Sequence, residues 1–81
     1  MTVYQFFKDH FNLPFNKYID VQMSFVLGKP VLDIFKFDEW LHEKYGNYED
    51  SGDSMRTIIL KQYGQDVMDK IEMLATIGWQ C

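Results

Sequence analysis

Cysteine, arginine and glycine are scarce in this chain of 81 residues. The single cysteine, Cys81, cannot form a disulfide or a multi-thiolate zinc site within one chain. The five glycines are isolated from one another, so no glycine-rich loop is present to bind a phosphate group. No apolar run approaches the length of a membrane span, and charged residues interrupt the first lines of the sequence, where a signal peptide would need an apolar core. We therefore expect a cytoplasmic protein that does not enter the membrane.

Positive charge is also scarce, because lysine and arginine together number 8 against 12 aspartates and glutamates, for a net charge of −4. A field of this sign repels nucleic acid, so direct binding to DNA or RNA is not expected. Lysine greatly outnumbers arginine, which occurs once, at Arg56. This balance is found in AT-rich sources such as some bacteria and their phages. It favours the hypothesis of a small accessory protein of a phage or mobile element.

Hydrophobic residues make up 47% of the chain and aromatic residues 17%, and these shares exclude a disordered polymer. A chain of this length buries only about 60–65% of the surface that its unfolded form exposes. We predict one small domain over residues 1–81. Two interpretations of the aromatic content stay open. The rings fill a small core, or some of them are exposed and bind a partner.

The start of the chain has helical spacing. Residues 2–11 place one apolar face on a helix, made by Val3, Phe6, Phe7 and Phe11. Thr2 is a suitable N-cap, and Pro14 disfavours helix for the residue before it. The spacing predicts a helix over 2–11.

The next segment alternates apolar and polar residues, which is typical of a half-buried strand. Its apolar positions are Ile19, Val21, Met23, Phe25 and Leu27. A turn at Gly28-Lys29-Pro30 separates it from a second β-rich run over 31–37. The pattern predicts a hairpin over 19–37. An isolated hairpin is marginally stable, so we expect helices to cover it or a second copy to extend its edge in a homodimer.

Three helices are predicted in the rest of the chain, over 38–45, 54–63 and 65–77. Asp38 and either Asp53 or Ser54 are suitable N-caps, and Gly46 and Gly64 follow helix ends. The predicted order is helix, strand, strand, helix, helix, helix. This order indicates an α+β fold in which an antiparallel hairpin packs against short helices.

Acidic residues concentrate in segment 38–55, where six acids against Lys44 leave a net charge of −5. Three of these acids lie near predicted helix starts, which favour negative charge: Asp38, Glu39 and Asp53. The other three have no local structural reason. Tyr48 lies among them with no helical or strand face to bury it. We predict an exposed partner-binding site at Glu43, Tyr48, Glu49 and Asp50. The alternative is a solvated acidic edge without function.

The sequence matches known motifs for metal binding only in part. Aligning Gly52 with position six of a calcium loop puts Ser54 at position eight and Ile58 at position twelve, where a hydrophobic residue and a glutamate are needed. Glu39 and His42 have the Glu-x-x-His spacing of di-iron bundles, but the motif occurs once on a short helix. We predict no enzyme activity, no cofactor and no metal site.

The sequence thus favours a small acidic protein-binding module or regulator that recognises a basic protein surface. Two alternatives stay open. The acids could imitate nucleic-acid phosphates and inhibit a nucleic-acid enzyme, in which case salt and DNA would displace the protein. The chain could also be a structural subunit of a homo-oligomer.

Overall fold

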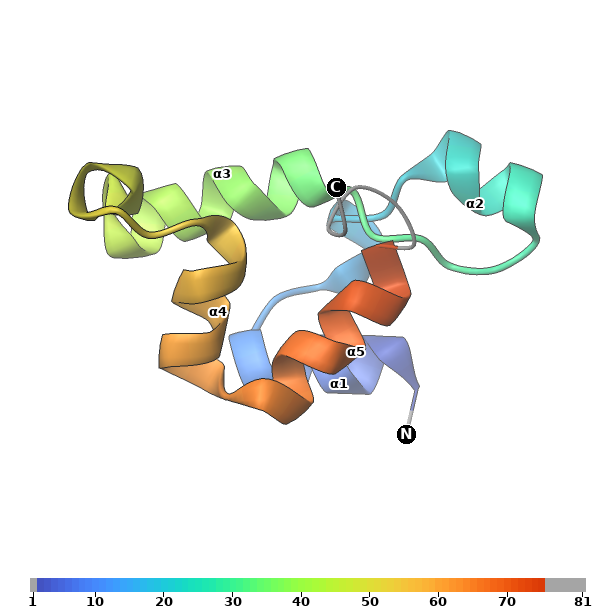
Figure 1. Ribbon diagram of the computed structural model, residues 1–81. Helices are drawn as coiled ribbons and strands as arrows, with labels where there is room; N and C mark the ends of the chain where they lie inside the picture. The colour runs from blue at the N-terminus through green and yellow to red at the C-terminus, as the bar shows by residue number, and fades with distance from the viewer. Residues whose placement is uncertain (1, 76–81) are drawn as a thin grey trace.

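A computed structural model describes residues 2–75 (Figure 1). Its elements, in chain order, are α1 (Val3–Phe11), η1 (Phe15–Lys17), α2 (Val21–Leu27), α3 (Ile34–Tyr45), η2 (Tyr48–Ser51), α4 (Met55–Tyr63) and α5 (Gln65–Ala75). Within residues 2–75, the β pairing consists of one isolated antiparallel bridge between Ile19 and Leu32. The predicted α+β class is therefore wrong, and the fold is all-helical.

The predicted hairpin over 19–37 is wrong because two aspartates start helices there. The Asp20 carboxylate accepts a hydrogen bond from the backbone N–H of Met23 at 3.0 Å, and Asp33 caps α3 in the same way through Phe35 at 3.0 Å. Gly28 ends α2 in the left-handed conformation with φ of 68°. Side-chain caps satisfy backbone donors that a helix start would otherwise leave unpaired. Residues 19–37 contain no strand, so the hairpin edge that the predicted homodimer would use is absent, and dimerisation itself stays a prediction.

The alternating pattern has a different consequence on a helix. Side chains on a helix advance by about 100° per residue, so apolar groups at every second position point in several directions. The pattern therefore cannot place all of its apolar side chains against the core. Accordingly, none of the seven residues of α2 is buried.

Helix α3 begins four residues earlier than predicted, at Ile34 and not at Asp38. Asp38 therefore lies inside the helix and does not cap it, which leaves its carboxylate available for tertiary contacts. The predicted end is where the structure has it, because Gly46 follows Tyr45 with a positive φ of 77°.

The remaining helices lie where the spacing predicts them. Thr2 caps α1 by accepting from the N–H of Gln5, and Ser54 caps α4 by accepting from the N–H of Thr57. Helix α5 is described as far as Ala75. The last two residues of the predicted helix 65–77, the glycine expected to end it and the tail after it lie outside the described residues.

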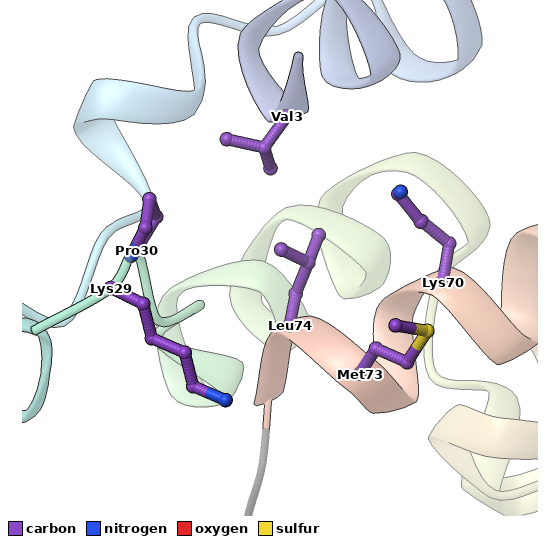
Figure 2. A pocket seen from close by; sticks show the side chains of 6 residues that line it. All are labelled: Val3, Lys29, Pro30, Lys70, Met73 and Leu74. Carbon is purple, nitrogen blue, oxygen red and sulfur yellow. The ribbon is translucent and has the colours of Figure 1, made fainter. Parts of the chain in front are cut away.

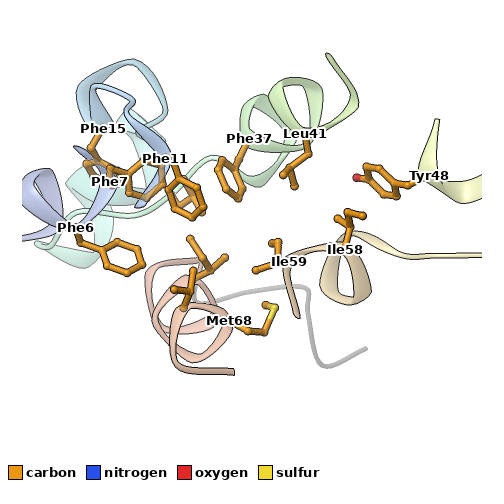
Figure 3. Close-up of a cluster of buried hydrophobic side chains, with 13 residues drawn as sticks. Phe6, Phe7, Phe11, Phe15, Phe37, Leu41, Tyr48, Ile58, Ile59 and Met68 are labelled. Carbon is orange, nitrogen blue, oxygen red and sulfur yellow. The ribbon is translucent and has the colours of Figure 1, made fainter. Parts of the chain in front are cut away.

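One hydrophobic cluster joins every described element except α2 (Figure 3). Phe11 lies among aromatic rings, with its centroid 4.8 Å from that of Tyr63, 5.1 Å from Phe37 and 5.7 Å from Trp40. The buried members of the cluster are Phe6, Phe7, Phe11, Phe15, Leu32, Phe37, Leu41, Tyr48, Ile58, Ile59, Val67, Met68 and Ile71. Most of the phenylalanines therefore fill the core, and Phe25 and Phe35 are exposed.

Helix α2 is attached to the rest of the molecule by backbone hydrogen bonds at its base. The N–H of Asp20 donates to the carbonyl of Val31 at 2.8 Å, and the N–H of Asp33 donates to the carbonyl of Tyr18 at 2.7 Å. Figure 1 shows α2 at one end of the molecule and the η2 turn at the opposite end. No helix within residues 2–75 has the length and apolar character to cross a membrane.

Candidate partner-binding surfaces

The predicted contact residue Tyr48 is in the core. Its side chain is only 4% exposed, and its ring stacks on the imidazole of His42 with centroids 4.4 Å apart and planes 11° apart. Its hydroxyl donates to the carboxylate of Asp38. Burial and this hydrogen bond raise the pKa of the Tyr48 phenol far above its usual range. The expectation that Tyr48 is exposed is therefore wrong, because α3 supplies a face that the sequence alone did not reveal.

His42 is held at both ring nitrogens. Nδ1 lies 2.9 Å from the backbone carbonyl oxygen of Asp38, and Nε2 lies 2.6 Å from Oε1 of Glu49. A neutral imidazole has one N–H, whereas the imidazolium has two, so acceptors at both nitrogens favour the charged ring. The hydrogen bond that His42 donates to the carboxylate of Glu49 raises the pKa of His42, and the same bond lowers the pKa of Glu49. We refer to Asp38, His42, Tyr48 and Glu49 as the His42 clasp.

The clasp also brings together possible metal ligands, because donor atoms of Asp38, His42 and Glu49 lie within 4.8 Å of one another. However, the carboxylate of Asp38 is on the Nδ1 side of the ring at 3.5 Å, and Glu49 is on the Nε2 side. An imidazole binds a metal ion through one nitrogen. A metal ion at either nitrogen would therefore replace the hydrogen bond that this nitrogen makes here, and the observed hydrogen bonds suit a protonated ring.

Apart from Asp50, which follows Glu49 on η2, the other acids of segment 38–55 have different surroundings. Glu43 lines a shallow groove of about 320 Å³ together with Lys17, Tyr18, Lys36, Glu39 and Trp40. Burial and the charge of Glu43 raise the pKa of Tyr18. Asp53 pairs with Lys61 at 2.8 Å. Of the four predicted site residues, Glu49 and Asp50 are exposed on η2, Glu43 is exposed elsewhere on α3, and Tyr48 is buried.

A second surface, which sequence reasoning missed, lies on α2. Val21 is 73% exposed, Phe25 88%, Val26 67% and Leu27 44%. We call these four residues the α2 apolar face. Val21 and Phe25 are one turn apart, and Val26 lies about 100° further round the helix from Phe25. The hairpin prediction placed Val21 and Phe25 against the core. The signal that could have corrected it is the pair of cap residues, Asp20 and Gly28.

A pocket of about 340 Å³ lies between α1, α5 and the connection from α2 to α3. Figure 2 shows Leu74 between the side chains of Lys29 and Lys70. The lining residues are Val3, Lys29, Pro30, Lys70, Met73 and Leu74. They supply two cations and no carboxylate, so the pocket suits an anionic group better than a metal ion.

No protein-family model, no curated protein and no solved structure matches this chain. The functional assignment therefore depends on the surfaces described above.

Proposed function

We propose that this protein is a non-catalytic protein-binding module whose main contact surface is the α2 apolar face. The observation that carries the proposal is that α2 exposes four large apolar side chains and buries none of its own. Burying a side chain of this size gains about 1.5–3 kcal/mol. Several large apolar side chains exposed close together on a small protein mark a site of interaction.

The construction of α2 supports this proposal. A helix of seven residues is too short to be stable alone, and α2 contributes no buried residue to stabilise it. It is held by the Asp20 cap, by the Gly28 end and by a hydrogen bond from the N–H of Val31 to Oγ of Ser24 at 2.9 Å. These contacts maintain a helix whose apolar side chains face solvent. Such a helix is ready to contact a partner without refolding.

A second candidate is a contact between a basic protein surface and the exposed acids of η2, Glu49 and Asp50, which we call the acidic end. The observation that favours it is that Glu49 and Asp50 lie exposed on η2, which the His42 clasp fixes against α3. Several of the other acids are engaged: Asp38 and Asp53 have partners, and Glu43 belongs to a different groove. This division favours a local contact over an extended imitation of nucleic-acid phosphates. We place both candidate activities in the cytoplasm.

Affinity capture with matched variants tests the proposal. The baits are the wild type, Phe25→Ser/Val26→Ser on α2, Asp50→Lys on η2, and Tyr4→Ser as an aromatic control on α1. Asp50 is preferred to Glu49 because changing Glu49 would break the clasp. Each captured protein is then purified and its affinity measured by calorimetry. We expect the α2 variant to bind at least about tenfold more weakly and the control to bind normally.

Other results of the capture experiment would contradict the proposal or favour an alternative. A partner whose affinity is unchanged by Phe25→Ser/Val26→Ser contradicts the proposal. If Asp50→Lys abolishes that binding, the acidic end is the contact surface. If DNA also displaces the protein from that partner in competition, the nucleic-acid-mimic alternative is supported.

A further inference from the structure

We infer that the occupant of the α2 apolar face is a second copy of this chain, with the two α2 helices packed antiparallel about a two-fold axis. This inference rests on the proposed function, because it names the partner of that same surface. It depends on the distribution of charge along α2, on the neutrality of its flanks and on the area available.

The charges at the two ends of α2 are of opposite sign. Asp20 caps the start of the helix, and Lys29 follows its end after Gly28. In an antiparallel pair the start of one helix lies beside the end of the other. Asp20 of each copy then lies near Lys29 of the other copy, and this pairing occurs twice. The two helix dipoles are also antiparallel, which is their favourable arrangement.

The surrounding segment is neutral overall. Asp20 and Asp33 balance Lys29 and Lys36 within residues 19–37, so two copies can meet there without net repulsion. The excess negative charge lies in residues 38–55. Their η2 turn is at the opposite end of the molecule (Figure 1). A two-fold contact through α2 therefore keeps the acidic ends of the two copies apart.

The apolar side chains suit a contact of a surface with itself. Val21 and Phe25 lie one turn apart on the same side of α2, so an antiparallel neighbour can place its Phe25 beside Val21 and its Val21 beside Phe25. Such a reciprocal contact hides the two most exposed apolar side chains of the helix. A strongly charged heterologous partner would need a complementary charge on this face, and the face has none in excess.

The available area predicts a weak dimer. The four side chains together offer at most roughly 400–500 Å² of apolar surface per copy, taking 150–250 Å² for a buried aromatic ring, and one two-fold contact covers only part of it because Val26 lies about 100° round the helix from Phe25. A standard stable interface buries about 800 Å² per partner. We therefore expect a dissociation constant of roughly 10 µM to 500 µM, at the weak end of specific contacts.

Analytical ultracentrifugation of the full chain from about 5 µM to about 1 mM covers this range. The weight-average mass should rise from 9.7 kDa toward twice that value. Phe25→Ser should remain monomeric throughout, whereas Tyr4→Ser should dimerise as the wild type does. Phe25 is exposed and belongs to a helix without buried residues, so circular dichroism should show the variant folded.

Charge reversal provides an independent readout. Lys29→Glu places like charges together at both ends of the paired helices, and we expect roughly three- to tenfold weaker dimerisation. Lys44→Glu makes the same change in net charge at the far end of α3 and should have no such effect. Weakening by Lys29→Glu should also diminish at high salt, because exposed pairs are screened.

Two results would overturn the inference. One is a wild type that stays monomeric up to about 1 mM, well above the range expected from the area. In that case the proposed function survives only if Phe25→Ser/Val26→Ser loses a heterologous partner in the capture experiment. Another is a dimer that Phe25→Ser does not weaken, which would place the interface elsewhere.

Discussion

The phenol ring of Tyr48 lies flat on the imidazole of His42, with ring centroids 4.4 Å apart. The two residues belong to different elements, η2 and α3, and the contact therefore fixes the loop on the helix. When the imidazole is charged, its position on an aromatic face adds a cation–π attraction. The segment between α3 and α4 is thus more than a connector. It closes over the end of the core and holds its acids in defined positions.

The first prediction concerns the contribution of Tyr48 to stability. Tyr48→Ala removes a buried ring, and we expect the free energy of unfolding to fall by about 3–4 kcal/mol. Tyr48→Phe keeps the ring and loses only the hydrogen bond to Asp38, which should cost about 1–2 kcal/mol. Urea denaturation measures both. Tyr4→Ala, at a half-exposed position, is the control, and an equal loss for Tyr4→Ala and Tyr48→Ala would contradict the assignment.

The second prediction concerns pH. The pKa of His42 is raised above its ordinary 6.5, so its contribution to stability is fully present below that pH and is lost as pH rises through the folded-state pKa. The pKa of Glu49 is lowered below its ordinary 4.5, so its contribution is present above that pH and is lost as pH falls. The clasp should therefore stabilise the fold most between these two values.

Comparison of the wild type with His42→Gln at about pH 5.5 and about pH 8.5 checks this expectation. The difference in unfolding free energy should be larger at the lower pH. His10→Gln removes the other histidine and controls for effects outside the clasp. In an NMR titration, Glu49→Gln should move the pKa of His42 downward. A difference that does not change with pH would show that His42 acts only through packing.

The third prediction compares the effects on stability of removing two N-cap residues, Asp20 and Asp33. Asp20→Ala removes the cap of α2, which should cost about 1 kcal/mol locally and be seen as faster amide exchange in residues 21–27. Global stability should change little, because α2 buries no side chain. Asp33→Ala removes the cap of α3, which carries buried Phe37 and Leu41, so the loss should be global. Equal effects on global stability would mean that α2 is coupled to the core.

The fourth prediction concerns zinc. Because a divalent ion at either nitrogen of His42 would replace a hydrogen bond that the ring makes, it should not raise the melting temperature by ligand linkage. Thermal unfolding with and without zinc, for the wild type and His42→Gln, measures this. A rise of several degrees in the wild type that disappears in His42→Gln would show that the clasp rearranges to bind metal.

Sequence reasoning was accurate where local signals agreed. In α1 and α4 the apolar spacing, a hydroxyl N-cap and a following breaker indicate the same helix, so tertiary structure had nothing to override. At residues 19–37 the signals conflicted. The apolar alternation favoured strands, whereas Asp20, Gly28 and Asp33 favoured two helices. The weight given to alternation was the error, because a short segment has too few residues for its period to be decisive.

For the candidate surfaces, too, some features could be predicted from the sequence and others could not. The exposure of Glu49 and Asp50 could be predicted, since they follow a helix end and are charged. The burial of Tyr48 and the pairing of His42 could not, because Asp38, His42 and Glu49 meet only once η2 folds over α3. The α2 apolar face was hidden by the strand prediction, which assigned the same side chains to a core.

The sequence by itself determined that the described chain is rich in core-forming aromatic residues, that helices start and end at particular caps and glycines, and that negative charge concentrates in residues 38–55. These properties depend on composition and on neighbours within one or two helical turns. Only the tertiary structure decided which of those side chains meet. Packing placed Tyr48 and His42 together, divided the acids between separate surfaces and left α2 outside the core. Contacts between distant segments depend on how the whole chain shares one small interior, and no local pattern encodes that choice.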